Sequence, residues 1–499
     1  MRLRFLALLV TASASLAAAP SSFAATASRV GDTVSYTSGR GDRDVARLIV
    51  TSGGDYLLRM RSWARQTLRA GRGCAISRPR EVRCPGRGVT RVSIRLGDGR
   101  SNSFSGQGLR VPITIVGGPG SDLVDLGGLS GTKPVVGATA GATIDTRAGS
   151  DSASVVARGG DYVVRGGGGR DSLAVQTVPG APAGSIELLG GDGNDHLAGG
   201  PASDGLDGGA GRDELVSGGG SDDLVGGSGP DTVVFRHPPT TDRAQDRPIS
   251  VTLDGRRNDG ALGDGALVAA DVENATIEDS LTAEDTLEGN DGPNVLLGYG
   301  TLRGLGGADS LGLNPSEGIP SRARAASTLD GGAGNDRVGA TIYNPYSDFA
   351  EPVPRADAIT CGDGSDVVFT DASDAVPADC ETTNPGMHVI AVSKLSSNGQ
   401  VRVRVNCTDP RLCRLASIGL SDSQRHAYAF SHPFGRRPVP VAVPSGGSVV
   451  RIVTFRANYW RRLHNRRAIP VTVSLAADPR SIFEVLNTRV FPRKLTLHR

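Results

Sequence analysis

The sequence is poor in several features that most enzymes of its size contain. Aromatic residues make up only 4% of the 499 residues, while glycine occurs 70 times. That balance does not suit a conventional catalytic domain. The chain has no HExxH motif, which disfavours a zinc metalloprotease, and no GxSxG motif, which disfavours a lipase. Its seven histidines are scattered. We therefore expect no enzyme activity.

Long hydrophobic runs are also missing, except near the start of the chain. Two arginines precede the apolar stretch 5–10, and small residues at 22–24 or 25–27 offer a cleavage site. Residues 1–27 are therefore predicted to be a signal peptide. No later run approaches the ~18 residues that a membrane-spanning helix needs. We expect the mature protein to be secreted and extracellular.

Cysteine is scarce, but its placement is informative. The six cysteines fit an oxidising compartment. They are too far from one another and from histidine for a zinc site of the CxxC type. Several connectivities are formally possible, and sequential pairing needs the least loop closure. The predicted pairs are Cys74–Cys84, Cys361–Cys380 and Cys407–Cys413.

What the sequence does contain is a nine-residue repeat between residues 190 and 234. Read in nines, this block is GGDGNDHLA, GGPASDGLD, GGAGRDELV, SGGGSDDLV and GGSGPDTVV. An aspartate at position six and an aliphatic residue at position eight recur in every copy. The pattern is typical of a calcium-dependent parallel β-roll. A glycine-rich linker would not keep an aliphatic residue in register.

The residue types in the repeat suit the chemistry of calcium. Ca²⁺ takes about six to eight oxygen ligands. One loop with a carboxylate and several backbone carbonyls supplies about half of them, so two stacked loops can complete the shell. The glycines permit positive φ and close approach of carbonyls. The predicted ligands in this block are Asp195, Asp204, Asp213, Asp222 and Asp231.

The block resembles the repeats-in-toxin (RTX, hemolysin-type) calcium-binding family. In that family two nonamers make one turn, so the resemblance implies that each loop stacks on the loop eighteen residues away. Asp195, Asp213 and Asp231 would then line one side of the roll, and Asp204 and Asp222 the other. Ala202 and Ser217 replace glycines of the pattern. We expect the loop at 199–204 to be the weakest site.

Degenerate repeats flank the regular block. Their spacing of 20 to 29 residues before residue 190 fits whole coils of a parallel β-helix. The segment 235–284 interrupts them. Its Asp254, Asp259, Asp264 and Asp271 could be further ligands, but we expect ordinary surface carboxylates. The aspartates predicted as further calcium ligands are Asp122, Asp171, Asp309, Asp336 and Asp366.

The predicted fold is all-β, with a parallel β-roll or β-helix solenoid at its centre. Its segments are a signal peptide (1–27), a small N-terminal β-rich unit (28–110), repeats (111–234), an irregular insertion (235–284), further repeats with a disulfide cap (285–385), and a basic β-sandwich-like domain (386–499). The CGxGxDxV…DCE end of the repeats adds to this layout. The whole resembles secreted hemolysin-type calcium-binding proteins of actinobacteria.

Charge is divided unevenly along the chain. From Gly386 onward nineteen Lys and Arg face four acids, a net +15, and the net +2 of the whole chain leaves −13 for the rest. The acidic part suits calcium. The basic part, with arginines at 461–462 and 466–467, suits an anionic cell-surface polymer or a membrane, or is a solvated face. We expect no nucleic acid partner, and the oligomeric state stays open.

Two other functions remain open. A parallel β-helix can itself be a carbohydrate-active enzyme of the lyase or epimerase type, because the repeats contain many aspartates and the sequence does not show which pairs converge. The C-terminal domain would also suit a cell-surface adhesin. The main prediction is a secreted calcium-binding protein whose repeats fold when calcium binds outside the cell.

Overall fold

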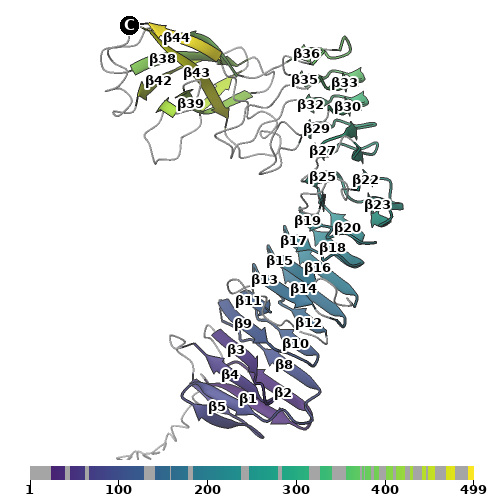
Figure 1. The fold of residues 1–499 in the computed structure, drawn as a ribbon, viewed down its shortest axis with the longest axis vertical. Coiled ribbons are helices and arrows are strands. Elements are labelled where there is room, and N and C mark those ends of the chain that lie inside the picture. Colours follow the sequence, from purple (N-terminus) through teal and green to yellow (C-terminus); the bar gives the residue numbers. More distant parts are fainter. Residues whose placement is uncertain are drawn as a thin grey trace, which may run out of the picture. The chain divides into compact units, whose positions relative to one another are not determined.

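The structure of the chain is a computed structural model. The residues it describes are 24–39, 45–61, 67–99, 101–127, 141–157, 159–177, 184–237, 247–278, 284–313, 326–339, 356–370, 374–375, 377–383, 387–392, 400–407, 412–421, 427–430, 441–444, 448–455, 468–477 and 493–498. All regular structure in these ranges is β-strand (Figure 1). The predicted all-β class is confirmed.

The chain divides into two compact units, which we describe separately. The first comprises residues 1–168 and 178–184, and the second comprises residues 169–177 and 185–499.

The first unit contains two sheets. The strands of one sheet are β1 (Ala24–Val30), β2 (Thr33–Thr37), β5 (Thr67–Ala70), β8 (Arg91–Arg95), β10 (Ile113–Val116), β12 (Ala142–Asp145) and β14 (Tyr162–Gly168). The strands of the other are β3 (Val45–Val50), β4 (Tyr56–Met60), β6 (Ala75–Arg78), β7 (Glu81–Cys84), β9 (Ser101–Gln107), β11 (Ser121–Leu126) and β13 (Ser152–Ala157). Antiparallel pairs such as β1–β2 and β3–β4 begin the unit. Parallel pairing then carries both sheets across residue 110, through β8–β10 and β9–β11.

Alternating burial explains these strands. In β13 every second residue is buried, and Ala153 and Val155 are among the inward side chains. This period of two is that of a strand with one face toward a core. In β1, Ala25 and Ala27 are buried and residues 24–27 pair with β5. Cleavage at the predicted 22–24 site would keep this pairing almost whole, and cleavage at 25–27 would remove it. Residues 1–23 of the predicted signal peptide lie outside the described residues.

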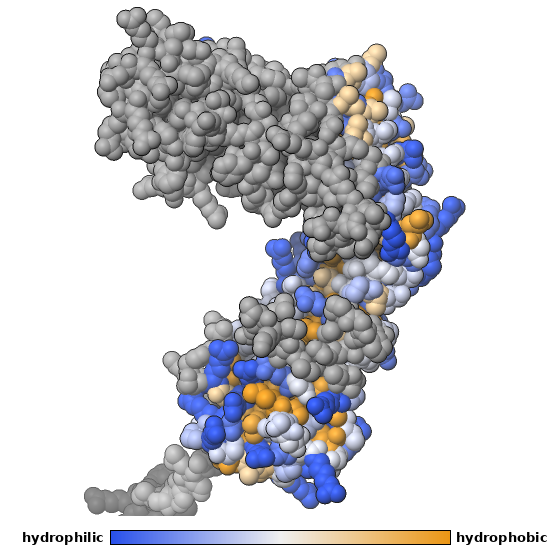
Figure 2. Space-filling view, viewed as in Figure 1, coloured by the Kyte–Doolittle hydropathy of each residue, from blue (hydrophilic) through white to orange (hydrophobic). Residues whose placement is uncertain are grey.

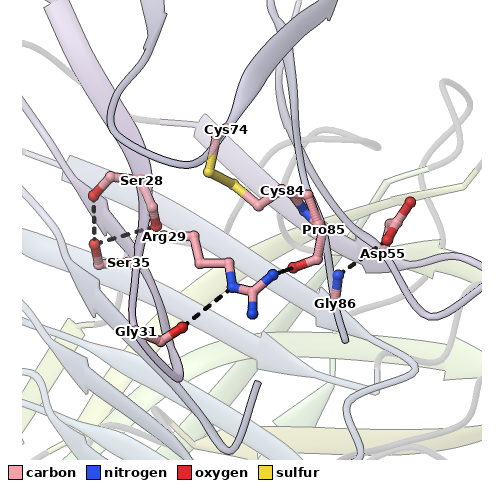
Figure 3. The surroundings of a disulfide bond; sticks show 9 residues. All are labelled: Ser28, Arg29, Gly31, Ser35, Asp55, Cys74, Cys84, Pro85 and Gly86. Carbon is pink, nitrogen blue, oxygen red and sulfur yellow. Dashed lines mark hydrogen bonds between the residues drawn. A yellow bond between two sulfur atoms is a disulfide. The ribbon is translucent and has the colours of Figure 1, made fainter. Parts of the chain in front are cut away.

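A disulfide closes the β6–β7 hairpin of the first unit (Figure 3). Cys74 and Cys84 are bonded, as predicted. Beside them, Arg29 donates from Nη1 to the Pro85 carbonyl at 2.9 Å. The amide of Gly86 donates to Asp55 Oδ1 at 3.0 Å. These contacts hold the segment that follows Cys84 against β1 and the end of the β3–β4 hairpin.

The second unit contains two rows of short parallel strands (Figure 1). One row contains β16 (Ile186–Asp192), β18 (Asp204–Ala210), β20 (Asp223–Ser228), β24 (Ala266–Val268), β22 (Ile249–Thr252), β26 (Thr286–Glu288), β28 (Thr301–Arg303), β30 (Thr328–Asp330) and β33 (Ala358–Thr360). The other contains β15 (Ser172–Thr177), β17 (His196–Ala198), β19 (Glu214–Val216), β21 (Thr232–Arg236), β25 (Asn274–Glu278), β27 (Val295–Gly298), β29 (Ser310–Leu313), β32 (Arg337–Gly339), β35 (Val367–Phe369) and β36 (Thr382–Thr383). Two two-residue strands, β31 (Ala333–Gly334) and β34 (Asp363–Gly364), pair within loops.

The nine-residue period determines the coil. Leu197 pairs in register with Leu215, and Leu206 with Leu224, so neighbours in one row are eighteen residues apart. The aliphatic residue at position eight points into the core in every copy, and each is at most 1% exposed: Leu197, Leu206, Leu215, Leu224 and Val233. The predicted parallel solenoid is confirmed.

The segment 235–284 leaves the coil and returns to it. Strand β23 (Arg257–Ala261) pairs antiparallel with β22 and β24. Strand β24 then pairs parallel with β20, and β25 with β21. The coil therefore resumes in register after the excursion.

The end of the repeats and the C-terminal sheet complete the second unit. Cys361 and Cys380 form the predicted disulfide. An antiparallel sheet follows, made of β37 (Met387–Val392), β38 (Gln400–Cys407), β39 (Leu412–Ser421), β40 (Ala427–Phe430), β41 (Val441–Pro444), β42 (Ser448–Phe455), β43 (Ala468–Ala477) and β44 (Arg493–His498). Most of its side chains lie outside the described residues, among them Cys407, Cys413 and the arginines at 461–467. The sandwich-like packing therefore stays a prediction.

Exposed large apolar side chains are few in the described part of the chain. They are Val30, Ile76, Leu123, Leu262, Leu305, Val450 and Ile452. Figure 2 shows hydrophobic colour gathered in limited areas, the broadest over the N-terminal strands. Within the described ranges there is no helix long and apolar enough to cross a membrane.

Candidate metal centre

One set of acidic and amide residues lies in register along the second unit. Each member immediately precedes a strand of the β15–β36 row, and these strands pair residue for residue. We call this set the long column. Its members are Asp171, Asp195, Asp213, Asp231, Glu273, Asn294, Asp309, Asp336, Asp366 and Glu381.

In the long column, one carboxylate oxygen of an aspartate accepts a hydrogen bond from a backbone amide of the coil before it. The amide of Asp195 donates to Oδ1 of Asp213 at 2.7 Å, and the amide of Asp213 to Oδ1 of Asp231 at 2.8 Å. The same bond joins Asp309 to Asp336 at 2.9 Å. These contacts replace backbone bonds that the loops cannot make, since the loop residues are not in strand geometry. The Oδ1 atom of each of these carboxylates therefore has a structural role.

The other oxygen of the same carboxylates is buried without a hydrogen bond. The Oδ2 atoms concerned have no partner among the described residues, and they belong to Asp195, Asp213, Asp231, Asp309, Asp336 and Asp366. These side chains are at most 3% exposed. A buried acceptor without a partner costs about 1–3 kcal/mol, and more when it is charged. Such a cost, repeated at one position of successive coils, points to a ligand that supplies the missing contact.

Burial also perturbs the ionisation of these groups. It raises the pKa of Asp195 and Asp231 to about 6, and that of Asp309 to about 7. The pKa of Asp213, Asp336 and Asp366 is raised as well, again mainly because the charged form loses water. The repeats therefore disfavour their own ionised carboxylates unless a cation compensates.

The glycine at position one leaves room where several oxygens meet. A Cβ on Gly190 would lie 2.5 Å from Asp195 Oδ2 and 2.5 Å from the Gly208 carbonyl of the next coil. A Cβ on Gly208 would lie 2.6 Å from Asp213 Oδ2 and 2.7 Å from the Gly226 carbonyl. The carboxylate of one coil and a carbonyl of the next thus converge on one point. A hard, oxygen-seeking cation is the ligand that this chemistry fits.

The oxygens that meet at such a point come from one carboxylate and one backbone carbonyl. Among the described residues no three His, Cys, Asp or Glu side chains group closely enough to hold a metal. A soft-metal or zinc site of the usual kind is therefore not built from these side chains. A calcium site here would use one or two carboxylates together with carbonyls of two stacked loops.

The second row of loops differs. Asp204 begins β18 and Asp222 immediately precedes β20, both in the β16–β33 row, and we call these two residues the short column. Asp222 has both oxygens occupied: Oδ1 accepts from the Asp204 amide at 2.9 Å and Oδ2 from the Ser217 hydroxyl at 2.5 Å. Asp204 Oδ2 accepts from the Gly200 amide at 2.6 Å, and its Oδ1 is buried without a partner in the described chain.

The backbone of the loop at 199–204 also departs from the pattern. Gly191 and Gly193 of the preceding loop have φ values of 110° and 139°. In the loop at 199–204 no described residue has a positive φ, and Ala202 stands where the second of these glycines would be. A residue with a Cβ strongly disfavours that conformation. This supports the prediction of a weaker site at 199–204 without testing it.

Asp122 lies in the first unit and has no free oxygen. Its Oδ1 accepts from the Asn102 side chain at 2.7 Å, and its Oδ2 from the Gly118 amide at 2.8 Å. Its own amide donates to Asp151 Oδ1 at 2.6 Å. The ladder seen in the second unit therefore also exists here, with its first carboxylate already satisfied by protein groups.

Several buried carboxylates escaped the sequence analysis. Asp285 is 0% exposed, and its oxygens accept from the Ile249 amide and contact His237 Nε2, each at 2.9 Å. Its signal was the D-x-L pattern at 285–287. Asp259 was predicted as a surface carboxylate, and this was wrong. It is 1% exposed and binds the amides of Thr252 and Val268 at 2.7 and 2.9 Å, which joins the excursion to the coil.

Comparison with known proteins adds no identification. No family model matches the chain, and no curated protein matches it. The class that fold and candidate site define is an all-β parallel solenoid with columns of buried aspartates.

Proposed function

We propose that this chain is a secreted calcium-binding protein of the RTX-like type, whose repeats fold when Ca²⁺ binds. The observation that carries the proposal is the row of buried Oδ2 atoms without hydrogen-bond partners in the long column. At Asp195, Asp213, Asp309 and Asp336 this oxygen lies beside a glycine where a carbonyl of the next coil also points. Oxygen-only donors of this kind suit Ca²⁺.

The mechanism is ion-coupled folding. Without the cation, the folded coil must bury ionised carboxylates or take up protons, and both cost free energy at neutral pH. A cation that binds only the folded coil raises the free energy of unfolding by mass action. Asp213 stands between Asp195 and Asp231 in the ladder and so would serve two adjacent sites.

Extracellular location belongs to the proposal. Two disulfides, Cys74–Cys84 and Cys361–Cys380, suit an oxidising compartment. Calcium is abundant in that compartment, so the repeats would fold after export. The long-column aspartates are almost fully buried, so they offer no accessible pair of carboxylates for polysaccharide cleavage.

Calcium removal from the full chain tests the proposal. We expect far-UV circular dichroism to lose β signal and the melting temperature to fall in a calcium chelator, and both to return when Ca²⁺ is added in excess. Mg²⁺ at the same concentration is the control, because it demands shorter, octahedral coordination. Identical spectra and melting temperatures with and without Ca²⁺ would refute calcium-coupled folding.

The C-terminal sheet is proposed to contact an anionic polymer or membrane surface. On β38, Val401 and Val403 are buried while Arg402 and Arg404 point outward. This alternation presents charge on one face of a strongly basic segment. Co-sedimentation of the full chain with anionic vesicles, neutral vesicles and an anionic polysaccharide tests it. Equal retention on the neutral vesicles would contradict it.

A further inference from the structure

Two short acidic segments close the two series of repeat loops in the same way. Asp271-Val272-Glu273 follows the excursion and lies against the loop 226–231. Asp379-Cys380-Glu381 follows the last repeat and lies against the loop 361–366. We call these the two D-x-E segments. Neither contains the glycines of the nonapeptide.

The glutamates take the place of the next aspartate in the long column. Glu273 Oε2 accepts from the Asp231 amide at 2.8 Å, the same distance at which Asp231 Oδ1 accepts from the Asp213 amide. Glu381 Oε2 accepts from the Asp366 amide at 2.6 Å. The residues that follow also keep the register, since Asn274 pairs with Thr232.

The aspartates of the D-x-E segments take the place of backbone carbonyls. In a regular coil the amide at position one donates to a carbonyl of the next coil, as Gly331 does to Thr360 at 3.0 Å. In the loop 226–231, the amides of Gly226 and Gly227 donate instead to the two oxygens of Asp271, at 3.3 and 2.9 Å.

The second closing loop repeats this pattern. The amides of Cys361 and Gly362 both donate to Asp379 Oδ2, at 3.1 and 3.0 Å. The central residue is buried in each segment, Val272 in one and the disulfide-bonded Cys380 in the other. The same hydrogen-bonding pattern occurs at both closing loops, which indicates a specific structural motif.

The closing loops also retain an incomplete site. Asp231 and Asp366 are 0% exposed, and Oδ2 of each is buried with no hydrogen-bond partner in the described chain. In the described parts of the chain, no further nonapeptide loop stacks on either loop to supply the carbonyls that complete other sites. The glutamate carboxylate is what the ladder provides at this place instead.

We infer that the loops 226–231 and 361–366 are terminal Ca²⁺ sites in which Glu273 and Glu381 supply the second carboxylate. This rests on the proposed calcium-binding function. Asp271 and Asp379 are positioning residues that hold the loop amides and carry no ion. An interior aspartate is shared between two sites, whereas each of these glutamates serves one site, so more ligand charge falls to the ion at a terminal site, which strengthens calcium binding. The terminal sites therefore bind first and hold the ends of each series closed.

The test uses the full chain with Glu273→Gln, Glu381→Gln and the double variant. Glutamine keeps an oxygen that accepts the hydrogen bond from the loop amide, and loses only the charge. Glu278→Gln and Glu288→Gln are matched controls, because both glutamates lie on the outer face of the same strand rows and pair with Arg236 and Arg303. Calcium stoichiometry by native mass spectrometry and a calorimetric calcium titration supply the readout.

We expect each glutamine variant to weaken one of the tightest calcium-binding steps by about tenfold or more, and the double variant to weaken two. The controls should match the wild-type chain. In chelator the melting temperature of Glu273→Gln should stay the same or rise, because a charge near Asp231 is gone. An unchanged titration in a wild-type background that binds calcium overturns the inference. So does a lower melting temperature in chelator and in calcium alike, which indicates a structural clamp alone. A wild-type chain that binds no calcium refutes the proposed function itself.

Discussion

The two columns of the repeat region contain the same residue type in nearly the same loop, yet Asp213 of one and Asp222 of the other differ in what their carboxylate oxygens contact. In the long column, Asp213 uses one oxygen for a backbone amide and leaves the other buried and unpartnered within the described structure. In the short column, Asp222 has protein donors on both oxygens. The difference comes from one residue, since Ser217 stands where Gly208 stands one loop earlier. A single hydroxyl can thus do locally what a cation would do elsewhere.

The columns also differ in continuity. The long column keeps its register past the excursion and on to Glu381. The row that contains the short column has Ile186 before Asp204 and Ala266 after Asp222, so its carboxylates have few neighbours. A stacked site needs two adjacent loops, so a continuous column gains more from each ion than an interrupted one.

The largest expected effect is the pH dependence of the calcium-free chain. Burial raises the pKa of Asp195 and Asp231 to about 6 and that of Asp309 to about 7, from 3.8. The folded state therefore binds protons more tightly than the unfolded chain. Its free energy of unfolding should be highest below about pH 4 and fall as the pH rises through about 6 to 7. Raising the pKa of one carboxylate from 3.8 to about 6 corresponds to a change of roughly 3 kcal/mol in the free energy of unfolding.

Urea unfolding at several pH values, in chelator and in excess calcium, measures this dependence. With calcium the trend should reverse, because the ion binds the ionised carboxylates. A urea midpoint that rises with pH in chelator would contradict the buried, uncompensated carboxylates of the long column.

The next largest effect compares the columns directly. Asp213→Asn should lower the free energy of unfolding in calcium by about 3 kcal/mol, since a ligand to two neighbouring sites loses its charge. Asp222→Asn should cost about 1 kcal/mol, because the groups on its oxygens come from the protein. In chelator Asp213→Asn should be neutral or stabilising. Equal losses for the two variants in calcium would remove the distinction between the columns.

A related pair addresses the position along the long column. Asp213→Ala and Asp366→Ala should each weaken two calcium-binding steps, because Asp213 lies between Asp195 and Asp231 in the ladder and Asp366 lies between Asp336 and Glu381. A calcium titration of the two variants measures this. A loss confined to one step in either variant would argue against sites shared between neighbouring loops.

A smaller effect tests the space at the position-one glycine. Gly208→Ala places a methyl group 2.6 Å from Asp213 Oδ2 and 2.7 Å from the Gly226 carbonyl. We expect a loss of about 2 kcal/mol in calcium, because the methyl group occupies the point where these oxygens meet. Gly205→Ala is the control, since the nearest atom to its Cβ is 3.9 Å away. Similar calcium titrations for both variants would contradict a cation at that point.

The smallest effect is expected from a substitution that makes a short-column loop resemble a long-column loop. Ser217→Gly removes the hydroxyl from Asp222 Oδ2 and recreates the arrangement around Asp213. In chelator it should lower the free energy of unfolding by about 1 kcal/mol. In calcium the free energy of unfolding should fall by less, because an ion can then bind the Asp222 Oδ2 atom that the hydroxyl no longer contacts. Chemical unfolding in both buffers measures the difference, and an equal loss in the two would leave the short column without a latent site.

Some parts of the candidate site were predictable and others were not. The repeat identified Asp195, Asp213 and Asp231 as one set, because a period of nine with two strands per coil places them eighteen residues apart in sequence. Glu273 and Glu381 were missed, because neither lies within a sequence that matches the nine-residue repeat. Glu273 lies 42 residues after Asp231, and Glu381 lies 15 residues after Asp366. Both join the long column only because the intervening chain folds back in register with the coil.

The sequence by itself determined the coil: its period, its inward aliphatic residue and the cysteines that pair at Cys74–Cys84 and Cys361–Cys380. These depend on local spacing, and local spacing is written in the chain. Only the tertiary structure decided which oxygen of each aspartate has a partner, because the donor is an amide of a neighbouring coil or a hydroxyl such as that of Ser217. It also decided that Glu273 and Glu381 end the long column, since a carboxylate's role depends on the groups stacked against it.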